Sequence, residues 1–337
     1  MKYVFVGIGT DDIKHYYSDF DKNDYSELVM LPSSILSLKL TLLGKLIFCL
    51  QGTCFENSRL AKRQRRLFNI ADYRATNKKL LKKCLDSIKK VKKEDEVCFI
   101  IYARIYENSG TVVLKELKKR YPKARFVVYF GDLMSSFGIY SVERLKNDFE
   151  RVYSFDEGDC RKYGFKYLQE PFSYLDYGNY TIDSDLSFIG AAKNRLNDIY
   201  KAYEKSKTSG LKNDFYIFNV KDEEQKYKDE IKYNCWLSFA DVMKHSLKSK
   251  AILEVVQKGA FSPTTRYSEA MLYKKYLITN CEAFRNCEKL PNNIIYYESI
   301  DDIDFEGIKK PLEYDNSIYV NELSINTFIR KIEEDLN

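Results

Sequence analysis

The chain has 337 residues, of which 45% are hydrophobic and 31% charged, with 14 glycines and 6 prolines. This balance excludes a wholly disordered, collagen-like or low-complexity chain, and the length suggests two domains. The net charge is +6, but the segment 59–93 carries 14 basic and two acidic residues. Such an uneven distribution indicates an anionic partner for this segment: nucleic acid, a membrane surface or a phosphorylated substrate.

Cysteine usage and the amino terminus narrow the class of protein further. The eight cysteines form no Cys-x-x-Cys pair, and only two histidines accompany them. We therefore expect reduced, mostly buried thiols in a cytoplasmic protein and no structural zinc. The first residues indicate a strand and a turn rather than a signal peptide. The apolar stretch 31–50 is interrupted by Lys39 and Lys45, so we expect a core or interfacial helix there rather than a membrane span.

The first half of the chain alternates short strands with longer helical patterns. Strands are expected at 3–6, 27–31, 97–102, 125–130, 151–155 and 165–168. Helices are expected at 33–50, 58–67, 76–91, 109–120, 142–149 and 157–163. This alternation predicts βαβ units around a parallel sheet, and we assign residues 1–170 to this domain.

A linker and a second alternation follow. Residues 171–184 have little periodicity, which indicates an interdomain linker. The second domain, 185–320, is expected to hold strands at 186–190, 214–220, 231–233, 251–256, 276–279 and 293–296. Its helices are expected at 196–207, 239–246 and 266–272, and residues 321–337 form a closing helix. Two consecutive α/β domains of similar size predict a two-lobed protein with a cleft between the lobes.

Two segments of the second half carry residues suited to binding an anion. In SFIGAAKNR, residues 187–195, a strand reaches Gly190 and is followed by Lys193 and Arg195 at the start of a helix. A turn of small residues with exposed N–H groups and two cations can hold a phosphate. An ordinary βα turn with solvated cations is the alternative.

The second segment is the turn KGAFSPTTR, which opens a helix that carries Glu269. Ser262, Thr264 and Thr265 are suitable N-cap residues, and free N–H groups at this helix start would face an anion. Arg266 adds a cation in the first turn. Glu269 lies on the same side of the helix and could accept hydrogen bonds from ribose hydroxyls. The alternative is a capped core helix with a capping-box glutamate.

These residues resemble the donor-binding domain of GT-B glycosyltransferases, and more closely that of bacterial capsule and lipopolysaccharide transferases. One shared pattern is F-x-G-x-x-K-x-R, which is matched by Phe188, Gly190, Lys193 and Arg195. The other pattern is matched by Ile252, Leu253, Glu254, Gln257, Gly259, Thr265, Arg266, Glu269 and Ala270. The segment 233–238 fits as well, and the resemblance covers residues 185–300.

The resemblance implies an α/β fold of two Rossmann-like domains facing a cleft, the GT-B fold. It also implies a UDP-sugar donor and no cofactor or metal, because helix-end and cationic groups stabilise the leaving diphosphate. Glu269 would hold the ribose, residues 262–266 the diphosphate, and Trp236 and Leu237 the base. The implied donor-binding residues are Gly190, Lys193, Arg195, Trp236, Leu237, Gln257, Ser262, Thr264, Thr265, Arg266 and Glu269.

The sequence also bears on the reaction chemistry. Many retaining GT-B enzymes place a glutamate eight residues before the ribose glutamate, where this chain has Phe261. This difference favours an inverting mechanism, which needs a general base on the acceptor side. The alternative candidates for the base are Asp11, Asp12, His15 and Asp132. A metal-dependent GT-A enzyme would need a D-x-D motif, and residues 183–185 and 302–304 fit those letters but indicate surface turns.

The basic segment completes the interpretation. Arg59, Lys62, Arg63 and Arg66 can share a helix face that contacts anionic lipid headgroups or a lipid-diphosphate acceptor. A solvated helix face and nucleic-acid binding are the alternatives. We therefore expect a cytoplasmic bacterial hexosyltransferase, peripheral to the inner face of the cell membrane. It would transfer a sugar from UDP to a lipid-linked saccharide in surface polysaccharide synthesis. A non-catalytic nucleotide-sugar-binding or partner subunit of the same fold is the alternative.

Overall fold

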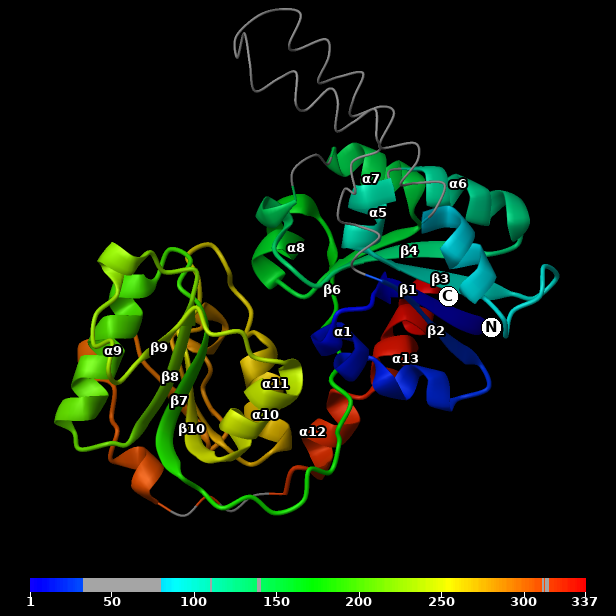
Figure 1. The fold of residues 1–337 in the computed structure, drawn as a ribbon. Coiled ribbons are helices and arrows are strands. Elements are labelled where there is room, and N and C mark those ends of the chain that lie inside the picture. The colour runs from blue at the N-terminus through cyan, green and yellow to red at the C-terminus, as the bar shows by residue number, and fades with distance from the viewer. Residues whose placement is uncertain (33–79, 110, 138–140, 311, 313–314) are drawn as a thin grey trace, which may run out of the picture. The chain divides into compact units, whose positions relative to one another are not determined.

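The computed structural model describes residues 1–32, 80–109, 111–137, 141–310, 312 and 315–337 (Figure 1). The chain divides into two compact units between Tyr153 and Ser154, with Leu336 assigned to the first unit. Two six-stranded sheets follow one another along the chain. The expected helices 33–50 and 58–67 lie outside the described residues, as do the four basic residues Arg59, Lys62, Arg63 and Arg66.

The first sheet has the strand order β2-β1-β3-β4-β5-β6. Its strands are β1 (Lys2–Ile8), β2 (Ser26–Leu31), β3 (Val97–Tyr102), β4 (Arg125–Phe130), β5 (Arg151–Ser154) and β6 (Lys166–Tyr167). The helices of this part are α1 (Asp11–Tyr16), α5 (Ala103–Ser109), α6 (Thr111–Arg120), α7 (Val142–Asp148) and α8 (Glu157–Tyr163), with 3-10 turns at Ser18–Lys22 and Met134–Ser136. Residues 80–87 are also helical. β1, β3 and β4 are almost wholly apolar because helices bury both faces of a parallel sheet.

The second sheet has the strand order β12-β11-β10-β7-β8-β9. Its strands are β7 (Ser184–Ala191), β8 (Asn213–Phe218), β9 (Lys232–Tyr233), β10 (Ser249–Glu254), β11 (Tyr276–Thr279) and β12 (Ile294–Tyr296). The helices in this part of the chain are α9 (Leu196–Thr208), α10 (Phe239–Leu247), α11 (Thr265–Leu272), α12 (Ser317–Glu322) and α13 (Ile325–Leu336). Four 3-10 turns complete it, at Asp222–Glu224, Glu282–Phe284, Ile300–Asp302 and Gly307–Lys309.

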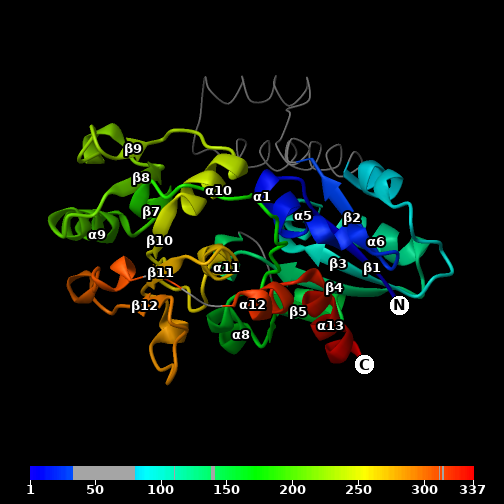
Figure 2. The same ribbon diagram turned by 90° about the horizontal axis from the view of Figure 1, so that it is seen from below.

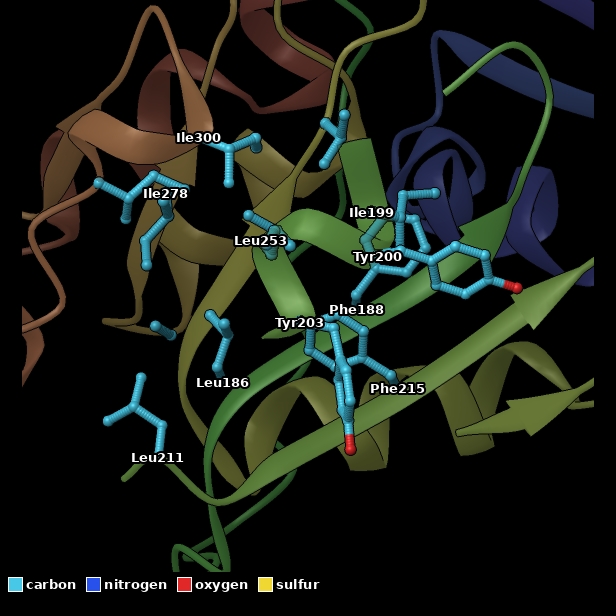
Figure 3. Close-up of a cluster of buried hydrophobic side chains, with 14 of the residues drawn as sticks. Leu186, Phe188, Ile199, Tyr200, Tyr203, Leu211, Phe215, Leu253, Ile278 and Ile300 are labelled. Carbon is cyan, nitrogen blue, oxygen red and sulfur yellow. The ribbon is translucent and has the colours of Figure 1, made fainter. Parts of the chain in front are cut away.

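Helices cover both faces of the second sheet. Figures 1 and 2 show α9 on one face and α10 and α11 on the other. Neighbouring residues of β10 enter different cores, because side chains alternate along a strand. Leu253 packs in the cluster that includes α9 (Figure 3), whereas Ile252 packs against Ala270 and Met271 of α11. This doubly covered parallel sheet is the Rossmann-like arrangement.

The strand order reverses once in each sheet. In the second sheet, β8 and β9 extend to one side of β7, and β10, β11 and β12 extend to the other. The carboxyl ends of β7 and β10 are therefore neighbours at which the connections diverge. Such a switch point leaves a crevice outside the strand ends, where α/β proteins bind ligands. The first sheet reverses in the same way between β1 and β3.

The sequence-based prediction of the fold is confirmed in the described part of the chain. Two parallel sheets in α/β units are present, and every strand expected there is found within a few residues of its predicted bounds. The prediction missed the short helices α1, α5 and α12, which hold only six or seven residues each. A helix of fewer than two turns shows little 3.6-residue periodicity. The domain ranges 1–170, 171–184, 185–320 and 321–337 stay a prediction.

None of the helices within the described ranges combines the length and the apolar character needed to cross a bilayer.

Candidate functional site

The candidate site lies at the switch point of the second sheet, where the loops after β7 and β10 meet. Arg195 joins these two loops. Its Nη1 donates to the carbonyl of Val255, and its Nη2 donates to the carbonyl of Ala191 at 3.3 Å. Burial lowers the pKa of Arg195, and the nearby carboxylate of Glu254 opposes this shift. An arginine stays charged in proteins, so a fixed positive charge lies at the base of the crevice.

A second arginine ties α11 to β7. Arg266 Nη1 donates to both carboxylate oxygens of Glu269 at 2.6 Å, and Nη2 donates to the carbonyl of Ile189 at 2.6 Å. Ser246 Oγ of α10 donates to Glu269 Oε2 at 3.0 Å. The Glu269 side chain is 1% exposed, against 19% for Arg266. The guanidinium is therefore the more accessible group of this pair.

A buried carboxylate that the sequence analysis missed holds the loop before α11. Asp156, the N-cap of α8, is fully buried in the second unit. Its Oδ2 accepts hydrogen bonds from the backbone N–H groups of Phe261 at 2.6 Å and Ser262 at 2.8 Å, and Oδ1 accepts from Asp159 N at 2.9 Å. Ser262 Oγ in turn accepts from Glu157 N at 2.9 Å. These two loop amides and this hydroxyl are therefore used within the protein.

A second buried carboxylate fixes the end of the same loop. Glu254 Oε1 accepts from the Thr264 N–H at 2.9 Å and from Thr264 Oγ1 at 2.6 Å. Glu254 Oε2 accepts from Thr279 Oγ1 at 2.6 Å. Thr264 also caps α11, since its Oγ1 accepts from Arg266 N at 3.3 Å. Burial raises the pKa of Glu254, and the bonds to Thr264 and Thr279 act in the opposite direction.

The other predicted donor-binding residues near the ends of β7 and β10 are exposed or half-buried. Lys193 is exposed and has a left-handed φ of 46°, and Gly259 has a φ of 94°. Gln257 is half-buried, Thr265 is half-buried in the first turn of α11, and Gly190 lies at the end of β7. A cation and two βα turns at the switch point are suited to an anionic ligand.

The only tryptophan of the chain lies at the same edge of the sheet. Trp236 follows β9, which runs parallel to β8, and its side chain is 81% exposed. The loop before it is fixed, because Asn234 Nδ2 donates to the carbonyl of Val220 at 2.7 Å and Asn234 Oδ1 accepts from Val220 N at 3.2 Å. Leu237 beside it is half-buried. A large exposed aromatic side chain on a fixed loop is a surface on which a planar base can stack.

The four base candidates lie after strands of the first sheet. Asp11 is exposed and pairs with Lys14 at 3.2 Å, while Asp12 is half-buried in the same helix. His15 is buried, and burial lowers its pKa to about 4, with Asp19 opposing the shift. α1 replaces the turn expected at these residues, and it places them at the carboxyl end of β1.

The fourth candidate follows β4 at the same edge of the first sheet. Asp132 Oδ2 accepts from Arg104 Nη2 at 3.1 Å. Arg104 also pairs with Glu107 at 2.9 Å, and its guanidinium lies 4.0 Å from the centre of the Phe137 ring. Both β1 and β4 neighbour β3, so the four candidates gather at one edge.

The acidic pair of the D-x-D alternative lies elsewhere. Asp183 pairs with Lys248 at 3.0 Å, and Asp185 pairs with Lys250 at 2.7 Å. Both flank the first residue of β7, which is the opposite edge from the crevice. Asp302 caps a 3-10 turn by accepting from Ser299 N. Asp183 and Asp302 are exposed, as a surface turn requires, but Asp185 is the half-buried second residue of β7, so the predicted turn over 183–185 is wrong at that residue.

No protein-family model matches the chain, and no curated protein matches it. Among solved structures, an alpha-glucosyltransferase in complex with UDP and a mismatched 13-mer DNA is similar over 99% of this chain and 98% of that chain. The TM-score is 0.54 at 13% sequence identity. This likeness establishes the fold: the chain has two Rossmann-like domains of the GT-B type.

Two further structures are similar at lower scores. TarM of S. aureus, in complex with UDP and saccharides, has 12% identity and a TM-score of 0.47 over 75% of this chain and 58% of that chain. UDP-N-acetylglucosamine 2-epimerase from Rickettsia bellii has 13% identity and a TM-score of 0.45 over 99% and 95%.

Proposed function

We propose that this chain is a glycosyltransferase that uses a UDP-sugar donor, bound at the switch point of the second sheet. The observation that carries the proposal is the cluster of cations where the βα connections after β7 and β10 meet, namely Lys193, Arg195 and Arg266. Three cations at one strand end give a site for a nucleoside diphosphate. The alpha-glucosyltransferase of similar fold is itself in complex with UDP, which supports this choice of ligand.

The roles within the site follow from exposure and charge. Lys193 and Arg266 would contact the diphosphate, and Trp236 would stack on the uracil. Positive groups held before the reaction begins stabilise the leaving UDP without later rearrangement. Asp156 and Glu254 fix the loop between β10 and α11. The hydroxyls of Ser262 and Thr264 support this loop, while Thr265, Gln257, Gly190 and Leu237 line the crevice.

Glu269 would contact the ribose only if Arg266 moved toward the diphosphate. The carboxylate is buried behind the guanidinium in this structure. A diphosphate carries the charge that attracts the guanidinium away from its internal partner. We therefore assign the ribose contact to Glu269 in the donor-bound state.

The reaction we propose is the transfer of a hexosyl unit with inversion and without a metal. Phe261 stands where retaining relatives of this type carry a glutamate, and the Arg161 guanidinium lies 4.1 Å from the centre of its ring. The general base is one of the alternatives Asp11, Asp12, His15 and Asp132. Asp11 pairs with Lys14, and Asp132 pairs with Arg104.

Our proposals for the acceptor substrate and for the cellular location of the protein rest on the sequence alone. We propose a lipid-linked saccharide acceptor in bacterial capsule or lipopolysaccharide synthesis, at the inner face of the cell membrane. The basic residues Arg59, Lys62, Arg63 and Arg66 would contact anionic headgroups there.

Ligand-dependent thermal stabilisation tests the donor site. UDP and UDP-sugars should raise the melting temperature by mass action, in the presence of EDTA as well as without it. Lys193→Gln should reduce the shift, and Lys221→Gln, at an exposed lysine of the same unit, should not. A panel in which no uridine nucleotide gives a shift would remove the basis for the proposal. UDP release that depends on an acceptor saccharide then separates a transferase from a non-catalytic binding subunit.

A further inference from the structure

A second set of hollows lies at the opposite edge of the second sheet from the donor site. One hollow of about 270 Å³ is lined by residues of the segment after β6 and by the ends of α10 and α11, including Tyr174, Tyr180 and Tyr273. A second hollow of about 330 Å³ is lined by Ile182, Tyr276 and residues near 308–310. Lys274 and Lys275 line both, so the two hollows are adjacent.

The lining of the two hollows is basic. It contains the five lysines Lys250, Lys274, Lys275, Lys309 and Lys310. Among the described residues that line them, none is acidic. Asp185 pairs with Lys250 and Glu306 pairs with Lys309, both near the solvent, where such pairs are weak. Asp315 is the acidic group that acts on Lys274, and it is bonded to Ser317. An excess of positive charge therefore surrounds the hollows.

Lys275 is a charged group with an unusual degree of burial. Its side chain is 8% exposed, and its ammonium donates to the carbonyl of Leu247 at the end of α10. Burial alone lowers its pKa to about 8. A lysine that is buried with a carbonyl as its partner gains from an anion that enters the hollow it lines.

Lys274 lines both hollows beside Lys275. It follows α11 with a left-handed φ of 54°, a conformation that glycine or asparagine usually adopts after a helix. The side chain is exposed. Its charge is therefore available at the surface to an anion in either hollow, since Lys274 lines both.

Aromatic rings form the other wall of the first hollow. Tyr174 stacks on Tyr273, with ring centres 5.4 Å apart and an angle of 28° between the planes, and Tyr177 packs on Tyr273 at 5.7 Å. Tyr273 is fixed by its hydroxyl, which donates to the carbonyl of Leu175 at 3.2 Å. Tyr174 is 39% exposed. A flat, partly exposed phenol ring is a surface on which the C–H face of a sugar ring can stack, and its hydroxyl can bond to sugar hydroxyls.

We propose that these adjacent hollows bind an acidic oligosaccharide, with sugar rings stacked on Tyr174 and acidic groups paired with Lys274 and Lys275. The smaller hollow has room for one sugar ring, and the larger one adjoins it as a subsite for the next. This site is distinct from the donor crevice, since it lies at the amino ends of β10 and β11. Oligosaccharide binding at this site can be measured directly, without the UDP-sugar donor and without catalysis.

The experiment is isothermal titration of the full chain with three oligosaccharides. Hexagalacturonate carries carboxylates, a phosphorylated pentamannose carries phosphate, and maltohexaose is neutral. We expect at least one acidic probe to bind and maltohexaose to bind far more weakly. Tyr174→Ala and Lys274→Gln should each weaken the acidic probe by about fivefold or more, which corresponds to the loss of one stacking or charge contact.

Matched variants serve as controls. Tyr167 has the same 39% exposure as Tyr174, and Lys201 is an exposed lysine on α9. Tyr167→Ala and Lys201→Gln should leave the affinity unchanged. Equal binding of maltohexaose, failure of both acidic probes, or equal losses in the control variants would overturn the proposal. Binding to phosphatidylglycerol vesicles that Lys274→Gln abolishes, with no oligosaccharide bound, would identify a lipid surface and overturn it too.

Discussion

Two buried carboxylates determine the conformation of the loop between β10 and α11, which borders the proposed donor site. Asp156 accepts from the amides of Phe261 and Ser262, and Glu254 accepts from Thr264. Loop N–H groups that already donate within the protein cannot also bind a diphosphate. Side chains must therefore neutralise the negative charge of the diphosphate. At the residue scale, cationic side chains rather than free backbone groups should therefore determine donor affinity.

Removal of the Asp156 carboxylate should destabilise the protein. Asp156→Ala leaves the backbone N–H groups of Asp159, Phe261 and Ser262 without their acceptor, and we expect a loss of about 3 kcal/mol in the free energy of unfolding. Asp156→Asn keeps one oxygen and should lose less. Urea unfolding measures both. An alanine variant as stable as the parent chain would show that these hydrogen bonds contribute little.

His15 should make stability depend on pH. Its folded pKa is lowered to about 4 from 6.5, so the unfolded chain binds the proton more tightly than the folded chain does. Stability should therefore fall as the pH decreases from about 6.5 to about 4. The loss from this group is about 1 to 2 kcal/mol once solvent screening is allowed for.

The His15→Phe variant tests this titration. Its unfolding free energy, followed by urea titration at several pH values, should fall less steeply than that of the parent chain between pH 6.5 and 4. Parallel curves for the two proteins would rule out His15 as the source.

At the element scale, the proposed site is formed by the βα turns after β7 and β10. Hydrogen bonds link α11 to both of these strands. Arg266 connects α11 to β7 through the Ile189 carbonyl, and Glu269 connects α11 to Ser246 of α10. One salt bridge thus fixes a helix start, a strand end and a neighbouring helix. Its loss should affect donor binding more than the global fold.

The Glu269→Gln variant separates these effects. It keeps the shape but removes the charge that holds Arg266 and that, in our proposal, accepts hydrogen bonds from the ribose hydroxyls. We expect UDP affinity to fall by about tenfold, with about 1 to 3 kcal/mol lost in stability. Affinity by titration calorimetry and stability by urea unfolding distinguish the two effects. Unchanged UDP affinity in a folded variant would exclude a ribose role for Glu269.

The elements themselves were predictable, and the contacts between distant segments were not. Apolar runs such as 97–102 and 276–279 indicate buried parallel strands by composition alone. Lys193 and Arg195 are predictable as site residues because they follow a strand within a few residues, and Arg266 is predictable because it lies in the first turn of a helix that N-cap residues precede. The role of Asp156 could not be predicted from the sequence, because Asp156 is 105 residues from Phe261, to which it is hydrogen-bonded. No local pattern records a hydrogen bond over that distance.

At the scale of the whole molecule, the succession of βα units along the chain determines the fold. The chain shares its fold with an alpha-glucosyltransferase at only 13% identity. A fold of this kind hosts several chemistries, so function has to be argued from the site. The proposed donor site lies in the second unit, with three cations and an exposed tryptophan.

The most direct test of this account is the fluorescence of Trp236 during titration with UDP in EDTA. The chain has one tryptophan, so the signal reports this loop alone. We predict a saturable change that ADP does not reproduce at the same concentration. Arg266→Met should shift the curve to about tenfold higher UDP, as expected for a lost charge-assisted contact. A signal that does not respond to UDP, in a protein that calorimetry shows to bind UDP, would place the base away from Trp236. Absence of UDP binding by both methods would contradict the donor site itself.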